Sequence, residues 1–145
     1  MESDHGVWLE AVVSGVLIAA TMVVHGLGMY CVVRVGRHML IAGHGSRRTV
    51  HIGQVLSLLV ALALTTHLLD ITLWAVTLDA LRLVSPVRHA LHFAALTYTT
   101  VGAPTSLPEH WLLLEAACAI AGTFTFAWTT AVMFQILNRV FEWHK

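Results

Sequence analysis

The stretch Thr97-Tyr98-Thr99-Thr100-Val101-Gly102-Ala103-Pro104 lies in a short connection between two long apolar segments and decides how the chain folds. Before it, Ser85-Pro86 is typical of a helix start, with serine as the N-cap and proline at the first helical position. After it, Ser106-Leu107-Pro108-Glu109 has the spacing of a capping box and predicts another start. The helix that begins at Pro86 would be about 20 Å long, which is too short to cross a bilayer.

The composition predicts that this stretch belongs to a membrane protein. The 145 residues are 57% hydrophobic and 11% charged, with a mean hydropathy of +0.76, whereas a soluble domain carries about 25% charged residues. The net charge of zero and the absence of a basic run give no indication of a nucleic-acid partner. The sequence contains no nucleophile–base constellation, phosphate-binding glycine loop or pair of carboxylates at catalytic spacing, so we do not expect an enzyme.

Three apolar segments are long enough to span a lipid bilayer: residues 9–33, 52–78 and 111–137. The polar connection between the first two and the C-terminal tail hold six of the eight Lys and Arg residues. The positive-inside rule therefore predicts a cytoplasmic first loop and C-terminus, with the N-terminus outside.

The connection between the second and third segments allows two arrangements. Irregular backbone at membrane depth is tolerated only where protein buries it or where it lines a water-filled path. We therefore expect either a re-entrant helix and loop, or a short amphipathic helix on the outer surface followed by an ordinary loop.

The residues Thr97-x-x-Thr100-Val101-Gly102 resemble the selectivity-filter signature T-x-x-T-V-G-Y-G of the tetrameric potassium channels. The segments 66–70 (THLLD) and 126–131 (FAWTTA) resemble the outer and inner helices of small bacterial members of that family. The resemblance implies an all-helical membrane fold and a homotetramer in the bacterial inner membrane. It assigns residues 1–51 to an extra transmembrane helix and cytoplasmic loop, and residues 52–145 to a pore domain. Within the pore domain it implies a pore helix over 86–99, a filter over 100–104 and an inner helix over 109–137.

In the family, rings of backbone carbonyls replace the hydration shell of the ion. The resemblance implies a selectivity filter built from Thr99, Thr100, Val101, Gly102 and Ala103, with a monovalent cation, K⁺ or Na⁺, in the pore. The outer half departs from the family, because Ala103 replaces the tyrosine and proline follows where the family has its second glycine. Potassium selectivity is therefore not implied.

Gly122 lies inside the third apolar segment. The inner helix of the family often has a glycine there as a gating hinge, and we carry that role over as one interpretation. The other is a point of close helix packing.

Ionisable residues inside the apolar segments are the remaining candidates for a site, because burying them without a partner is costly. His25, His67 and Asp70 form an expected intramembrane polar cluster, and Asp70 is one turn from His67 on the same helix face. One interpretation is a metal or proton site, with zinc or copper bound by His67, Asp70 and His92 or by the cluster. The other is a buried contact in which Asp70 pairs with His67 or with pore-helix groups.

The sequence thus predicts the pore-forming subunit of a tetrameric cation channel that resembles potassium channels and has an altered outer filter. The alternative is a non-conducting membrane scaffold or accessory subunit with the same fold, which binds a metal through intramembrane histidines. Besides the lipid bilayer and further copies of the chain, an accessory membrane subunit is a candidate partner.

Overall fold

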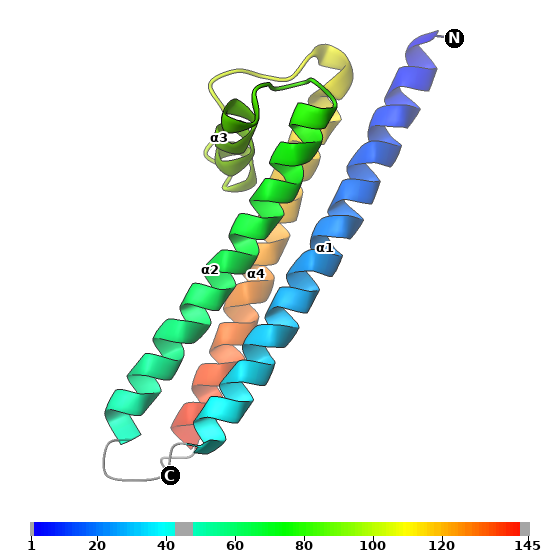
Figure 1. Cartoon of the computed structure of the whole chain (residues 1–145). Helices are drawn as coiled ribbons and strands as arrows, with labels where there is room; N and C mark the ends of the chain where they lie inside the picture. The colour runs from blue at the N-terminus through cyan, green and yellow to red at the C-terminus, as the bar shows by residue number, and fades with distance from the viewer. Residues whose placement is uncertain (1, 43–47, 143–145) are drawn as a thin grey trace.

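A computed structural model describes residues 2–42 and 48–142, and this part of the chain is helical. Its elements are α1 (Glu2–Ala42), α2 (Arg48–Ala80), α3 (Val87–Tyr98), a single 3₁₀ turn η1 (Glu109–Trp111) and α4 (Leu112–Glu142). Three long helices lie side by side, with α1 and α4 running in one direction and α2 in the other (Figure 1). The short helix α3 lies beside the half of this bundle that contains the N-terminus, on the opposite side of α2 and α4 from α1.

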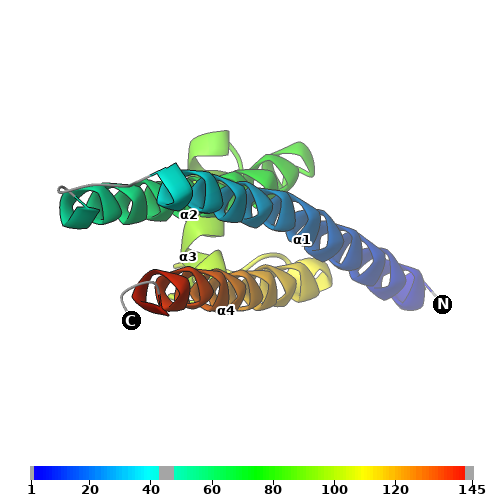
Figure 2. The ribbon, with the colours of Figure 1, turned by 90° about the horizontal axis from the view of Figure 1, so that it is seen from below.

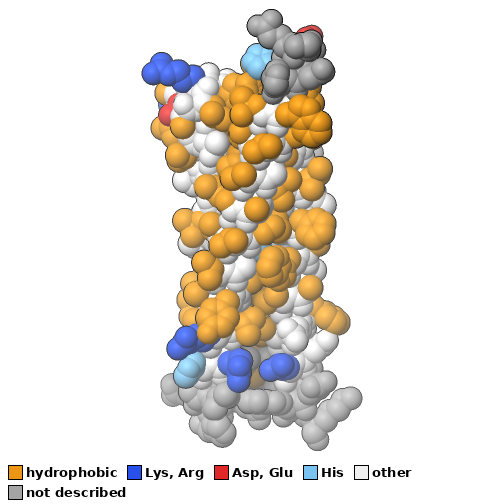
Figure 3. All heavy atoms as spheres, turned by 90° about the vertical axis from the view of Figure 1, so that its right-hand side faces the viewer, with side chains coloured by type: hydrophobic (Ala, Val, Ile, Leu, Met, Phe, Trp, Pro, Cys, Tyr) orange, Lys and Arg blue, Asp and Glu red, His pale blue; other side chains and the backbone are white. Residues whose placement is uncertain are grey.

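Three helices are long and apolar enough to cross a membrane, over Gly6–Met39, Ile52–Ala80 and Glu109–Arg139. On the face shown in Figure 3, hydrophobic side chains cover the long middle of the bundle, and Lys and Arg side chains lie at its two ends. This distribution matches a hydrocarbon core bounded by polar headgroups. The prediction of an integral membrane protein with three spans is therefore confirmed by the length and composition of the helices.

The spanning helices extend further than predicted at the cytoplasmic side of the assumed topology. Helix α1 continues past Val33 to Ala42, and α2 begins at Arg48 rather than Ile52, so much of the predicted polar connection is helical. A glycine inside a helix costs only about 1 kcal/mol relative to alanine. Gly36 is buried, and its position faces the side chains of Leu59 and Ile136. Packing of this helix face therefore outweighs the glycine's weak helix propensity.

Both predicted helix starts were wrong in detail. Pro86 is itself the N-cap of α3, and no side chain caps that helix. Before α4, the N-cap of the 3₁₀ turn is Pro108, again without a side-chain cap, so Ser106 and Glu109 do not form a capping box. The first free amides of α4 are instead capped by a side chain of α1. The Glu10 carboxylate accepts hydrogen bonds from the backbone N–H groups of residues 113 and 114.

The position of α3 is fixed by close packing on α4. Its C-terminal residue Tyr98 lies against Gly122, where a Cβ atom would overlap the Tyr98 carbonyl oxygen. Gly122 is ten residues beyond Leu112, so α3 reaches about 15 Å along α4 from that helix's start. Figure 2, seen from below, shows α3 behind α2 and α4. Gly122 is therefore a point of close helix packing, and its role as a gating hinge stays a prediction.

Candidate functional site

A closed ring of hydrogen bonds joins five side chains from all four helices in the middle of the bundle. His25 Nδ1 of α1 lies 2.7 Å from Asp70 Oδ2 of α2, which also accepts a 3.0 Å bond from the Tyr98 hydroxyl of α3. The Tyr98 oxygen lies 3.1 Å from His67 Nδ1 of α2. On the far side, the Nε2 atoms of His25 and His67 each lie 3.1 Å from Thr129 Oγ1 of α4. We call these five residues the polar ring.

Four of the five residues of the polar ring are buried, and the fifth, Thr129, is partly exposed. His25, Asp70 and Tyr98 have no exposed area, and His67 is 6% exposed. Phe126 stacks on the His67 ring with centroids 4.3 Å apart, and Trp128 lies 5.7 Å from the His25 ring. Because ionised groups inside a protein in a membrane are costly unless paired, mutual satisfaction of these five side chains is what makes their burial tolerable.

The ring residues also bond to one further hydroxyl of α4. The Tyr98 hydroxyl oxygen lies 2.6 Å from Thr125 Oγ1. Hydrogen bonds in such a chain strengthen one another inside a protein. The ring is therefore one connected network rather than five separate contacts.

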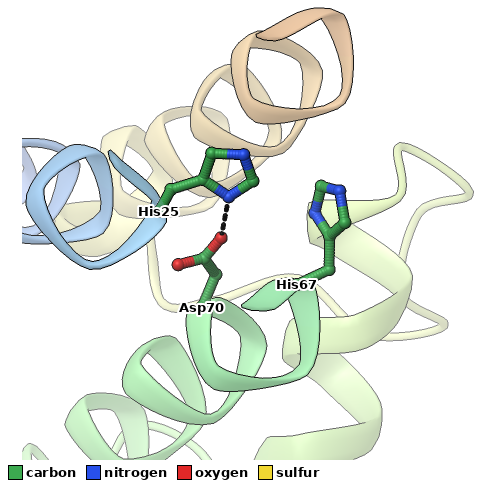
Figure 4. Close-up of side chains that lie close together, drawn as sticks. All are labelled: His25, His67 and Asp70. Carbon is green, nitrogen blue, oxygen red and sulfur yellow. Dashed lines mark hydrogen bonds and ion pairs between the residues drawn. The ribbon is translucent and has the colours of Figure 1, made fainter. Parts of the chain in front are cut away.

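The Asp70 carboxylate is used on one side only. Its Oδ2 atom takes part in the ring, whereas Oδ1 is buried and has no hydrogen-bond partner among the described residues. Figure 4 shows that Oδ1 points away from the His67 imidazole. A buried carboxylate oxygen without a donor is costly, so this atom marks spare ligand capacity in the site.

The structure brings together His25, His67 and Asp70, the predicted intramembrane cluster. One ligand atom from each lies within 4.8 Å of the other two, so the group could hold a metal ion (Figure 4). Of the two expected contacts of Asp70, the one with His67 is not formed, whereas the one with a group of the short helix α3 is, because Asp70 bonds to Tyr98 as well as to His25. His67 shares the α2 face of Asp70, but its ring nitrogens face Tyr98 and Thr129 instead.

His92 does not join this group. The buried face of α3 consists of Ala90, Phe93, Ala94, Thr97 and Tyr98. His92 is exposed, lies off this face and lines a separate cavity of about 690 Å³ beside α3. Arg88 and His89 line the same cavity.

Two residues of the polar ring, and the buried Glu10 that caps the start of α4, could not be assigned from the sequence. Tyr98 stood in a variable position of the filter signature, and Thr129 carried no pattern that separates it from other threonines in α4. Glu10 sits near the start of an apolar segment and resembles an interfacial residue, although it is 4% exposed and bonds to α4. The signal that could have found Glu10 is an acidic residue inside a spanning helix. Using that signal requires knowing that the helix begins before Glu10.

The predicted filter forms a turn that ends α3. The N–H of Thr100 bonds to the Thr97 carbonyl at 2.9 Å, and that of Val101 bonds to the Leu96 carbonyl at 3.0 Å. Thr100 has φ of 60°, so it occupies the left-handed position that usually takes glycine in this kind of helix ending. Thr99 and the three residues after it are exposed, with Val101 at 73%, and Ala103 is half-buried. We call residues 99–102 the loop.

No family model, curated protein or solved structure matches the chain. The likeness to potassium channels therefore rests on the residues of the filter stretch and of the two flanking helices. What the site can do follows from its geometry.

Proposed function

We propose that the chain is the pore-forming subunit of a homotetrameric channel for monovalent cations, K⁺ or Na⁺, in the bacterial inner membrane. The N-terminus would lie outside and the C-terminus in the cytoplasm. The observation that carries the proposal is an exposed, irregular backbone at the middle of the bundle, namely the loop. Four subunits would surround a central axis with the loop of each subunit facing that axis, as the resemblance implies.

The depth of the loop supports this proposal. The Tyr98 carbonyl lies against Gly122, about 15 Å along α4 from Leu112, which is half of a hydrocarbon core of about 30 Å. Lipid cannot satisfy the polar backbone of the loop that follows. Further copies of the chain, or a water-filled path between them, would cover it.

The direction of α3 favours a cation at this place. The helix begins at Val87 near the end of α2 and ends at Tyr98 deep in the bundle. A helix carries about half a negative elementary charge at its C-terminal end. Four such ends around one axis would stabilise a cation beside the loop.

Helix α4 offers a suitable wall for the path below the loop. Thr123, Ala127 and Thr130 follow one another at helical spacing and are exposed on one face. These are small or hydroxyl side chains, which leave room for water and allow helices to approach closely. In a tetramer this face of the inner helix would line the cavity.

One observation favours the second candidate, a non-conducting scaffold or accessory subunit with the same fold. The backbone N–H groups of the loop are bonded back onto α3, and Pro104 follows Ala103 where the family has a flexible glycine. A closed turn of this kind would have to open before its carbonyls could form rings around an ion.

Liposome flux separates the two candidates. The purified chain is checked for tetramers by native mass spectrometry, and K⁺ and Na⁺ fluxes are then followed separately. We expect flux from the unmodified tetramer and its loss in Val101→Lys, which would place four positive charges at the axis. Val87→Lys is the matched control, because Val87 is also exposed but lies at the outer end of α3, and its flux should persist.

Two outcomes would contradict the channel. A monomer in native mass would remove the central axis. A pure tetramer without flux of either ion would favour the non-conducting scaffold.

A further inference from the structure

We propose that the polar ring is a binding site for a divalent transition metal, Zn²⁺ in the first place, held by His25, His67, Asp70 and the oxygen of Tyr98. This inference concerns binding and holds whether or not the chain conducts ions. It differs from the predicted set of ligands, because His92 takes no part and α1 and α3 each supply a donor.

The proposed donor atoms lie close together, and one ligand atom from each of His25, His67 and Asp70 lies within 4.8 Å of the other two. Asp70 Oδ2 lies 2.7 Å from His25 Nδ1 and 3.0 Å from the Tyr98 hydroxyl oxygen. The same hydroxyl oxygen lies 3.1 Å from His67 Nδ1. Around tetrahedral Zn²⁺ with bonds of about 2.0 to 2.1 Å, neighbouring donors lie about 3.4 Å apart. Each of these three donor–donor distances would therefore have to increase by about 0.3 to 0.7 Å to accept the ion. Figure 4 shows the His25 imidazole on α1 facing the Asp70 carboxylate, with the His67 imidazole on the same helix as Asp70.

The chemistry of the donors selects the class of metal. Two imidazoles with a carboxylate suit Zn²⁺ and its neighbours, whereas Mg²⁺ and Ca²⁺ prefer oxygen ligands alone. Asp70 has no exposed area, and its Oδ1 atom has no hydrogen-bond partner among the described residues, so the carboxylate is held in the interior by its Oδ2 contacts alone.

The outer contacts of the ring match what a metal site requires. Thr129 Oγ1 lies 3.1 Å from the Nε2 atoms of both His25 and His67. A hydrogen bond at the second nitrogen fixes the orientation of a ligating imidazole. Thr129 would therefore act as a positioning residue that leaves both Nδ1 atoms free for the ion.

The site also has an entrance. His67 is covered by Phe126, which stacks on it and is itself 40% exposed. Rotation of this one surface side chain would uncover the His67 edge of the ring. A bound ion would then tie α1, α2 and the last residue of α3 together, directly before the loop.

Cobalt binding tests the site, because Co²⁺ replaces Zn²⁺ and absorbs visible light strongly in tetrahedral sites. The untagged chain in detergent is titrated with Co²⁺ and then with Zn²⁺. We expect one Co²⁺ per chain, displaced by Zn²⁺, and at least a tenfold loss of affinity in His25→Gln and His67→Gln. The exposed His92→Gln is the matched control and should bind as the unmodified chain does, and Thr129→Val should keep tetrahedral binding with reduced affinity.

A measurement on the unmodified chain protects the test against variants that do not fold. X-ray absorption of the Zn²⁺-loaded protein should give two imidazoles with oxygen donors in the first shell. Failure of the folded chain to bind Co²⁺ or Zn²⁺ would overturn the proposal. So would a first shell without two imidazoles, or binding that survives in folded His67→Gln.

Discussion

The polar ring and the loop lie at the same depth of the bundle and differ in how they are completed. The ring joins all four helices, and its five side chains satisfy one another within a single chain. The loop is exposed, and Val101 has 73% of its surface open. The polar ring is therefore bonded within one chain, whereas the loop needs further copies of the chain or water to cover it.

The two regions meet at a single peptide bond. Tyr98 is the last residue of α3 and belongs to the ring, and Thr99 is the first residue of the loop. A change in the ring can thus reach the loop through the end of α3. Substitutions that break one region and spare the other measure how strongly they are connected.

The largest effect is expected from breaking the ring at Asp70. Removing one partner of a buried ion pair costs about 3 to 5 kcal/mol, because the remaining group is left unpaired. Asp70→Ala should lower the free energy of unfolding in detergent by about that amount. Asp79→Ala is the control, since Asp79 lies half-exposed near the end of α2 and should change stability by less than about 0.5 kcal/mol. Equal losses in both variants would show that the ring is not a stabilising unit.

The contact between α3 and α4 gives the next effect. In Gly122→Ala the new methyl group would overlap the Tyr98 carbonyl oxygen, and such overpacking costs about 1 to 3 kcal/mol. Gly15→Ala is the matched control, because nothing lies within 4 Å of a Cβ there. It should stabilise α1 by up to about 1 kcal/mol. Thermal unfolding followed by circular dichroism checks both, and a stabilised Gly122→Ala variant would contradict the close approach of α3.

The sequence was sufficient for the parts of the fold that depend on local pattern. Long apolar runs gave the three spans, and the Pro86 region gave a short helix before the filter stretch. The prediction of the start of α4 was wrong in detail because the residue that caps this helix lies far away in the sequence. The amides at the start of α4 take the Glu10 carboxylate, 103 residues earlier, whereas the local capping box suggested Ser106 and Glu109.

The candidate site was predictable only as a set of costly residues. His25, His67 and Asp70 stand out because ionisable side chains are rare inside spanning segments. Which of these residues pair depends on how α1 is rotated about its own axis relative to α2. The periodicity of apolar residues does not determine that rotation. Tyr98 and Thr129 complete the ring, but neither side chain is charged at neutral pH, so the rarity of charged groups in spanning segments does not single them out.

A smaller effect is expected at the start of α4. Glu10→Ala removes the acceptor for two backbone N–H groups, and loss of a helix cap costs about 1 kcal/mol. Glu109→Ala tests the rejected capping box and should be nearly neutral, because no side chain caps the 3₁₀ turn. Unfolding midpoints of the two variants, measured side by side, give the difference. A larger loss of stability in Glu109→Ala than in Glu10→Ala would show that the local capping box starts this helix after all.

The smallest effect on the stability of one chain is expected in the loop, and it sharpens the contrast with the interior. Val32 is fully buried and Val101 is 73% exposed, so the same change to alanine compares the two environments. Val32→Ala loses two buried methylene equivalents, about 1.6 kcal/mol, whereas Val101→Ala should stay within about 0.5 kcal/mol. If copies of the chain cover the loop, Val101→Ala should instead lower the fraction of tetramer in native mass spectra, with the unfolding of the monomer unchanged. A loss of monomer stability as large as that of Val32→Ala would mean that the loop is already buried within one chain.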